Sequence, residues 1–242
     1  SFGYLTETAT DRFAFDIDGV LRASDIPGVG GDFRFDDANA ALSYSREGAN
    51  SRISATADYN RVNLDFLDPF ELADLSDTDL INSSGTRQST NARLIFETGT
   101  SGPLGFGIEL GHEAVDYSDT TDPGLFDSQT NDIALTSRLR LSPVAEARVR
   151  LSQEDYTAED LVLTDRTTRA LSFGVAYELS PITMLDVIVG VEKIDTVGSG
   201  TDRGNFGTVT LTRALANGSA GVILDRSFGI EAGRTSLRVN RS

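Results

Sequence analysis

The chain has 242 residues, a formal net charge of −16 and no cysteine. The acidic balance argues against a nucleic-acid-binding protein, whose contact surfaces are basic. The absence of cysteine excludes a disulfide framework, a thiolate metal site and a cysteine nucleophile. No apolar stretch approaches the roughly 20 residues of a transmembrane helix. No change in composition divides the chain, so we expect a single domain over residues 1–242.

Segments that alternate apolar and polar side chains follow one another along the whole chain. In the segment 144–155, alanine, valine and leucine alternate with glutamate, arginine and serine. A β-strand turns successive side chains to opposite faces, so each segment predicts a strand with one apolar and one polar face. In chain order we predict strands near residues 2–8, 12–22, 34–46, 51–64, 89–100, 104–116, 130–142, 144–155, 166–179, 183–195, 204–215, 219–227 and 233–241.

The connections between these strands alternate between tight and long. Asn217-Gly218 favours a type I′ hairpin turn, and Leu-Ser-Pro occurs at 141–143 and again at 179–181, where proline stops the strand ladder. Three stretches at or beside the long connections, 65–79, 113–128 and 154–165, hold sixteen acidic residues and no lysine or arginine. The tight connections are near 9–11, 47–50, 101–103, 142–143, 180–182 and 216–219, and the long ones near 23–33, 65–88, 117–129, 156–165 and 196–203.

Opposed residues in a hairpin must share a face, which tests the predicted strands against each other. We place the centres of three hairpins at Ser101, Pro143 and Ile182. In these registers, apolar residues lie opposite apolar residues and polar residues lie opposite polar ones. The predicted apolar pairs are Phe96–Phe106, Leu94–Ile108, Leu139–Ala147, Leu179–Leu185 and Tyr177–Val187, and the polar-face pairs are Arg93–Glu109, Arg140–Glu146 and Glu178–Asp186.

The predicted strands are about twice the ~5 to 6 residues usual in soluble sheets and match the ~9 to 11 that cross a tilted bilayer. Their polar face is dense in charge of both signs, which indicates the lumen of a membrane barrel rather than a soluble surface. The predicted lumen-lining residues are Arg93, Glu97, Glu109, Arg138, Arg140, Glu146, Arg148, Arg150, Glu178, Asp186 and Glu192.

With these features the chain resembles Gram-negative outer-membrane β-barrel proteins, in particular porin-like barrels, and Arg138–Arg150 and Tyr177–Glu192 carry the resemblance best. It implies an all-β, antiparallel, up-and-down transmembrane β-barrel of about 12 strands, in a range of roughly 10 to 14. It also implies an outer-membrane location, with outer-membrane lipid and lipopolysaccharide as partners. The segment 237–242 lacks the terminal aromatic usual in such barrels, and the apparent strand count is odd. These departures indicate a portion of a longer barrel, incomplete at the C-terminus.

Three features could carry chemistry of another kind. His112 falls on the apolar face near the long-connection end, where an interfacial side chain explains it better than a catalytic one, because no serine can be assigned to it. The glycines in 28–31 are better read as a flexible connection than as a phosphate loop, since no helix pattern follows. We therefore predict no enzyme.

The acidic residues in the long connections are most simply explained as solvated loops. The alternative is loosely bound Ca²⁺ or Mg²⁺, held by Asp74, Asp77, Asp79, Asp116, Asp119 and Asp122.

Three functions remain open at this stage. The first is porin-like passage of small solutes through a charged lumen, with acidic mouths that favour cations. Arginines at 138, 140, 148 and 150 could instead form an anion-selective constriction, or simply neutralise Glu146 and Glu178. The second function is a non-conducting structural or receptor barrel, or a surface anchor, forming a homo-oligomer or contacting other envelope proteins. The third is a soluble all-β surface or adhesin module.

Overall fold

The computed structural model describes residues 1–26, 30–64, 84–160, 164–227 and 234–241. Thirteen β-strands account for most of them. Within these ranges no helix has the length and apolar character needed to cross a membrane. The strands are β1 (Phe2–Glu7), β2 (Asp11–Ile26), β3 (Gly30–Glu47), β4 (Ser51–Asn63), β5 (Thr86–Thr98), β6 (Leu104–Ser118), β7 (Ser128–Ser142), β8 (Ala145–Ala158), β9 (Arg166–Ser180), β10 (Thr183–Thr196), β11 (Gly200–Leu215), β12 (Gly218–Ser227) and β13 (Arg234–Arg241).

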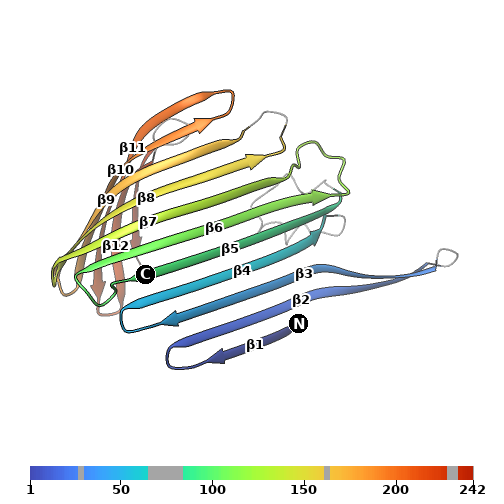
Figure 1. The fold of residues 1–242 in the computed structure, drawn as a ribbon, viewed down its shortest axis with the longest axis horizontal. Helices are drawn as coiled ribbons and strands as arrows, with labels where there is room; N and C mark the ends of the chain where they lie inside the picture. Colours follow the sequence, from blue (N-terminus) through green and yellow to red (C-terminus); the bar gives the residue numbers. More distant parts are fainter. Residues whose placement is uncertain (27–29, 65–83, 161–163, 228–233, 242) are drawn as a thin grey trace.

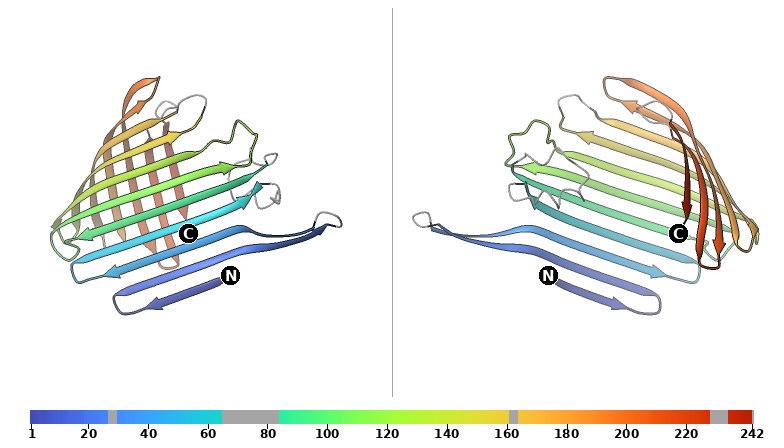
Figure 2. Two further views of the ribbon diagram at one scale, coloured as in Figure 1. Left: turned by 45° about the vertical axis from the view of Figure 1, so that its right-hand side comes forward. Right: turned by 180° about the vertical axis from the view of Figure 1, so that it is seen from behind.

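All thirteen strands belong to one antiparallel sheet in which each strand pairs with its neighbours in sequence. The sheet curls along its width, so that β12 and β13 come to lie behind the middle strands (Figures 1 and 2). This confirms the predicted all-β, antiparallel, up-and-down architecture, and the strand count is one above the central prediction. A meander is expected here because every connection joins adjacent antiparallel strands.

The sheet has two edges, formed by β1 and β13. In the described residues β1 pairs with β2 alone and β13 with β12 alone. Strand directions alternate along a meander, so β1 and β13 run the same way. Direct pairing between them would therefore be parallel, unlike every other pairing in the sheet.

Two predicted long connections are wrong. The connection expected near 196–203 is a tight turn of residues 197–199, because β10 continues to Thr196 and β11 begins at Gly200. Residues 23–33 were expected to be a long loop, but β2 continues to Ile26 and β3 begins at Gly30. The pair forms a long hairpin that extends beyond the other strands (Figure 1). The glycine-rich run is thereby divided: Gly30 and Gly31 lie in β3, and residues 28 and 29 lie outside the described residues. Alternation is weak across Asp25 to Asp32, so the sequence pattern did not reveal the extension.

The hairpin registers are correct in one case and shifted by two residues in two others. Arg140 pairs with Glu146 as predicted. Phe96, however, pairs with Ile108 rather than Phe106, and Leu185 pairs with Tyr177 rather than Leu179. A register shift between Thr183 and Met184 and the positive φ of Gly99 lengthen these two turns. A slip of two residues keeps every side chain on its face, so the assignment of faces survives.

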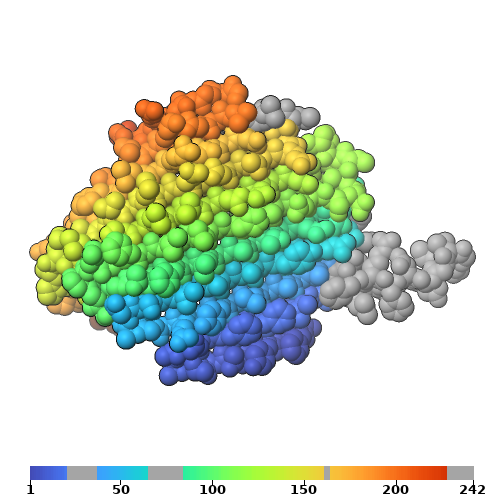
Figure 3. Space-filling view, in the orientation of Figure 1, coloured from blue at the N-terminus to red at the C-terminus, as the bar shows by residue number. Residues whose placement is uncertain are grey.

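The two faces of the sheet differ sharply in how they meet solvent. The apolar side chains are uncovered: Leu151 is 52% exposed, and Leu171 and Val189 on the neighbouring strands are similar. Only three hydrophobic side chains of the described residues are buried, those of Leu64, Ala134 and Ile194. The convex face seen in Figure 3 is thus a close-packed single layer of strands, with no second layer over it in the part of the chain described.

Candidate functional site

The charged residues predicted to line a lumen lie on strands β5 to β10, on the face opposite the exposed apolar side chains. The pairings place them in register across the wall, with Arg138 beside Arg148 and Arg140 beside Glu146. Several ion pairs join strands that are not adjacent. Such strands lie roughly 10 Å apart, so bridging them is favoured on a concave side, where side chains converge.

Glu109 of β6 joins two arginines into one network. Its carboxylate accepts a hydrogen bond from Arg93 of β5 and another, at 2.7 Å, from Arg150 of β8. On the intervening strand β7, the register neighbour of Arg150 is Thr136 and that of Glu109 is Ala134, which is only 3% exposed. A methyl group at 134 leaves the arginine room to lie along the wall, and Glu109 is consequently well covered, with 16% of its side chain exposed.

Arg148 of β8 and Asp186 of β10 form the second network. The guanidinium reaches both carboxylate oxygens across the intervening strand β9. The residue beneath it is Gly174, where an added Cβ would lie 2.7 Å from Arg148 Nε. A glycine is required at this position because any side chain would displace the arginine from its path.

Two glycines of β6, on the same concave face, also lie beneath charged side chains. An added Cβ at Gly105 would lie 2.9 Å from Arg138 Nη2, and one at Gly111 would collide with the Asp132 carboxylate. Over Gly105, Arg138 donates a hydrogen bond of 3.0 Å to the carbonyl of Gly99. Over Gly111, Asp132 comes within 4.0 Å of Arg93. Small residues therefore let the charged side chains lie flat against the wall.

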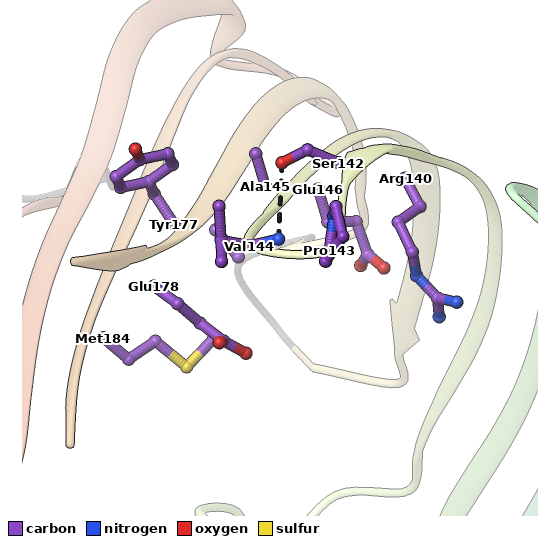
Figure 4. Close-up of a pocket in the computed structure, with 10 residues that line it drawn as sticks. Arg140, Ser142, Pro143, Val144, Ala145, Glu146, Tyr177, Glu178 and Met184 are labelled. Atoms are coloured by element: carbon purple, nitrogen blue, oxygen red, sulfur yellow. Dashed lines mark hydrogen bonds between the residues drawn. The ribbon is translucent and has the colours of Figure 1, made fainter. Parts of the chain in front are cut away.

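Near the short-turn end the charges surround a cavity of about 690 Å³. Arg140, Glu146, Glu178 and Met184 project into it beside the Pro143 turn (Figure 4), in which the Ser142 hydroxyl accepts a hydrogen bond from the Val144 amide. The ion pair of Glu146 is with Arg138, at 3.7 Å, although its register neighbour is Arg140.

Several polar-face residues were missed by the sequence reasoning, among them Asp132 and Glu154. Asp132 joins the Arg93 network, and Glu154 pairs in register with both Asp132 and Thr168. The signal was present, because Asp132 alternates in phase with Arg138, and Glu154 alternates in phase with Arg148 and Arg150. The list of expected lumen residues stopped short of the long-connection end of these strands.

The ion pairs leave a net excess of acid on this face. Four of the five predicted lumen arginines have a carboxylate partner, and Arg140 is the one of these five that has no ion pair within the described residues. Arg52 of β4 lies on the same face, opposite Glu97 in register. Among the described residues, three of the six predicted lumen acids, Glu97, Glu178 and Glu192, have neither a hydrogen-bond nor an ion-pair partner on their carboxylates. The surface left to interact with a solute is therefore mainly anionic.

The remaining predicted residues stand apart from this face. His112 lies on the apolar face, in phase with Leu110, and its Nδ1 lies 2.8 Å from Asn131 Oδ1. Of the acidic residues considered for cations, those at 74, 77 and 79 lie outside the described residues. Asp116, Asp119 and Asp122 are described, and in the described ranges no three carboxylate or imidazole groups converge as a metal site would require.

Comparison with known proteins gives a fold and no family. No model of a known protein family matches the chain, and no curated protein sequence matches it either. Among solved structures, the chain is similar to a bacterial polysaccharide outer membrane secretin, with a TM-score of 0.58 and 13% sequence identity. The match covers 98% of this chain and 76% of that one. The chain therefore shares its fold with an outer-membrane protein.

The two faces of the sheet offer different kinds of interaction. Its concave face offers fixed charges and hydrogen-bonding groups but, among the described residues, no nucleophile paired with a base. Hydrated ions and small polar solutes can exchange their water shell with such a surface. Its convex face offers mainly apolar contact along the middle of the strands, which suits lipid.

Proposed function

We propose that this chain forms the wall of a porin-like pore in the outer membrane of a Gram-negative bacterium. In this arrangement the charged concave face lines a passage for small solutes, and the apolar convex face contacts lipid. Passage requires no catalytic residue and no cofactor. The observation that carries the proposal is the pairing of an uncovered apolar face with a concave ion-pair network on the same strands.

The exposed apolar face supports a membrane location over a soluble module. Soluble proteins rarely expose contiguous apolar patches larger than a few hundred Å². Here the large apolar residues of β5 to β10 form a continuous outward band, including Leu135, Leu151 and Leu171, each roughly half exposed. In water such a band would drive aggregation, whereas in a bilayer it is the lipid contact of an outward-facing wall.

The charge inventory supports a preference for cations. Glu178 and Glu192 have no ion-pair partner among the described residues, while four of the five arginines predicted to line the lumen are paired with carboxylates. Fixed negative charge along a narrow path raises the local cation concentration. An anion-selective constriction at residues 138–150 would need free arginines, and three of the four arginines there are held in ion pairs.

Conductance of the purified full chain in a planar lipid bilayer tests the proposal. In a tenfold KCl gradient we expect channels whose reversal potential has the sign of cation preference. The Glu178→Gln/Glu192→Gln double variant removes two uncompensated charges without breaking an ion pair, so it should shift the reversal potential toward zero. Folded, membrane-inserted protein that never conducts would overturn the proposal and favour a structural or receptor barrel.

A further inference from the structure

Three basic residues form a row on the outward, apolar face of the sheet. Arg169 of β9 pairs in register with Lys193 of β10, which pairs on its other side with Arg203 of β11. The row lies just beyond Leu171 and Val191, which are 48% and 53% exposed. Three cations side by side are unexpected on a face that is mainly apolar and in a chain of net charge −16.

The row is only partly neutralised within the protein. Asp195 accepts a hydrogen bond from Lys193 and lies 3.9 Å from Arg169, and Asp155 of β8 also attracts Arg169, so two carboxylates stand beside three cations. Arg203 is exposed and has no hydrogen-bond or ion-pair partner among the described residues. Like charges opposite one another destabilise a sheet, so the row costs stability unless an external anion compensates it.

A groove with apolar walls leads to this row. It has a volume of about 550 Å³, and its walls combine Leu151, Leu171 and Val191 with the three cations. A second groove of about 700 Å³ shares Leu171 and Val191 with the first and extends along Phe173 and Val189. The surface thus presents a mainly apolar trough with a cluster of three cations at one end and the single cation Arg226 along the second groove.

We propose that this trough and its basic row bind lipopolysaccharide, with an acyl chain along the trough and the lipid A phosphates on Arg169, Lys193 and Arg203. The assignment rests on the proposed membrane-spanning function. The row lies at the end of the sheet that carries the longer β6–β7 and β8–β9 connections, although β10 and β11 are joined there by residues 197–199 alone. Long loops of outer-membrane barrels face the cell exterior. The phosphorylated lipid of that leaflet is lipopolysaccharide, and its phosphates complement the charge of the row.

Arg213 supplies a matched control. It lies on the same strand and the same face as Arg203, at the opposite end, and is also exposed. Its register neighbours are Thr183 and Ala220, so no other cation pairs with it. Arg203→Gln and Arg213→Gln therefore remove the same charge from the same strand, inside and outside the proposed site.

The experiment measures binding of fluorescently labelled lipid A to the detergent-purified full chain. Each cation beside an anionic headgroup contributes about fivefold in affinity. We expect Arg203→Gln to weaken binding about fivefold, Lys193→Gln/Arg203→Gln roughly 30-fold, and Arg213→Gln not at all. Lipid A stripped of its phosphates should bind the unchanged protein more weakly than the double variant binds intact lipid A, because the double variant keeps Arg169 and the dephosphorylated lipid loses its contact with all three cations.

Three results would overturn the assignment: equal weakening by Arg213→Gln, equal binding of dephosphorylated lipid A, or equal binding of phosphatidylglycerol. Unboiled electrophoresis in SDS reports whether each variant is folded, and Arg203→Gln remains informative if the double variant is not. Bilayer conductance is measured on the same samples. A protein that binds lipid A without conducting would refute the pore while leaving the lipid site standing.

Discussion

Arg148 and Asp186 are joined across an entire strand. They belong to β8 and β10, and the guanidinium passes over Gly174 of β9 to reach both carboxylate oxygens. The contact explains why Gly174, which has no side chain, occupies the middle of a long strand. It also couples three strands on the concave face without filling the space in front of them.

Gly174→Val should break this bridge. The added side chain would occupy the path of Arg148, and loss of a charge-assisted hydrogen bond costs about 1.5 to 3 kcal/mol. We expect a lower urea midpoint for unfolding in lipid vesicles, followed by mobility in unboiled SDS electrophoresis. Gly107→Ala is the control, since an added Cβ there meets its neighbours at ordinary contact distances of 3.7 to 3.8 Å. Equal effects of the two variants would contradict the bridge.

Glu109→Gln should change charge selectivity more than the loss of one charge explains. The substitution leaves Arg150 without a carboxylate and Arg93 with only the longer contact to Asp132, so more positive charge becomes available on the concave face. Glu97→Gln removes the same charge but breaks no ion pair. We expect the reversal potential in a KCl gradient to move further toward anion preference for Glu109→Gln. Indistinguishable potentials would show that the network does not control selectivity.

Arginine substitutions on the convex face should destabilise the protein according to depth. Val149 lies mid-strand on β8, whereas Leu141 lies beside the short turn of β7, and both are outward and exposed. An arginine at the bilayer midplane costs about 2 to 4 kcal/mol, falling to about 0 to 1 near an interface. Urea unfolding in vesicles should therefore separate Val149→Arg from Leu141→Arg. A similar cost for both would argue against a bilayer around this face.

Single cysteines can map the two faces, because the chain contains none of its own. Arg150→Cys and Leu151→Cys place a thiol on opposite faces of adjacent positions in β8. In intact outer membranes we expect a charged maleimide to label Arg150→Cys and a lipid-soluble maleimide to label Leu151→Cys. Labelling of neither thiol by the lipid-soluble reagent, with protein in the soluble fraction, would favour a soluble β-module.

Much of this fold was predictable from local pattern. The alternation of apolar and polar side chains predicted thirteen strands, and Arg140 and Glu146 pair in the predicted register. The errors arose where alternation fades or a turn departs from the simplest form. The β2–β3 hairpin extends through residues without a clear apolar period, and the irregularity at Thr183/Met184 shifts its hairpin by two residues. Neither feature has a signal in side-chain polarity.

The sequence by itself determined the strands, their order and the face each side chain occupies, because strand geometry imposes a period of two and short turns force neighbours to pair. Only the tertiary structure decided which charges meet. Arg148 finds Asp186 and Arg150 finds Glu109 because the sheet curls and because small residues lie between them. The row of Arg169, Lys193 and Arg203 likewise depends on register across three strands. Such contacts join residues from different hairpins, so no local pattern in the chain contains them.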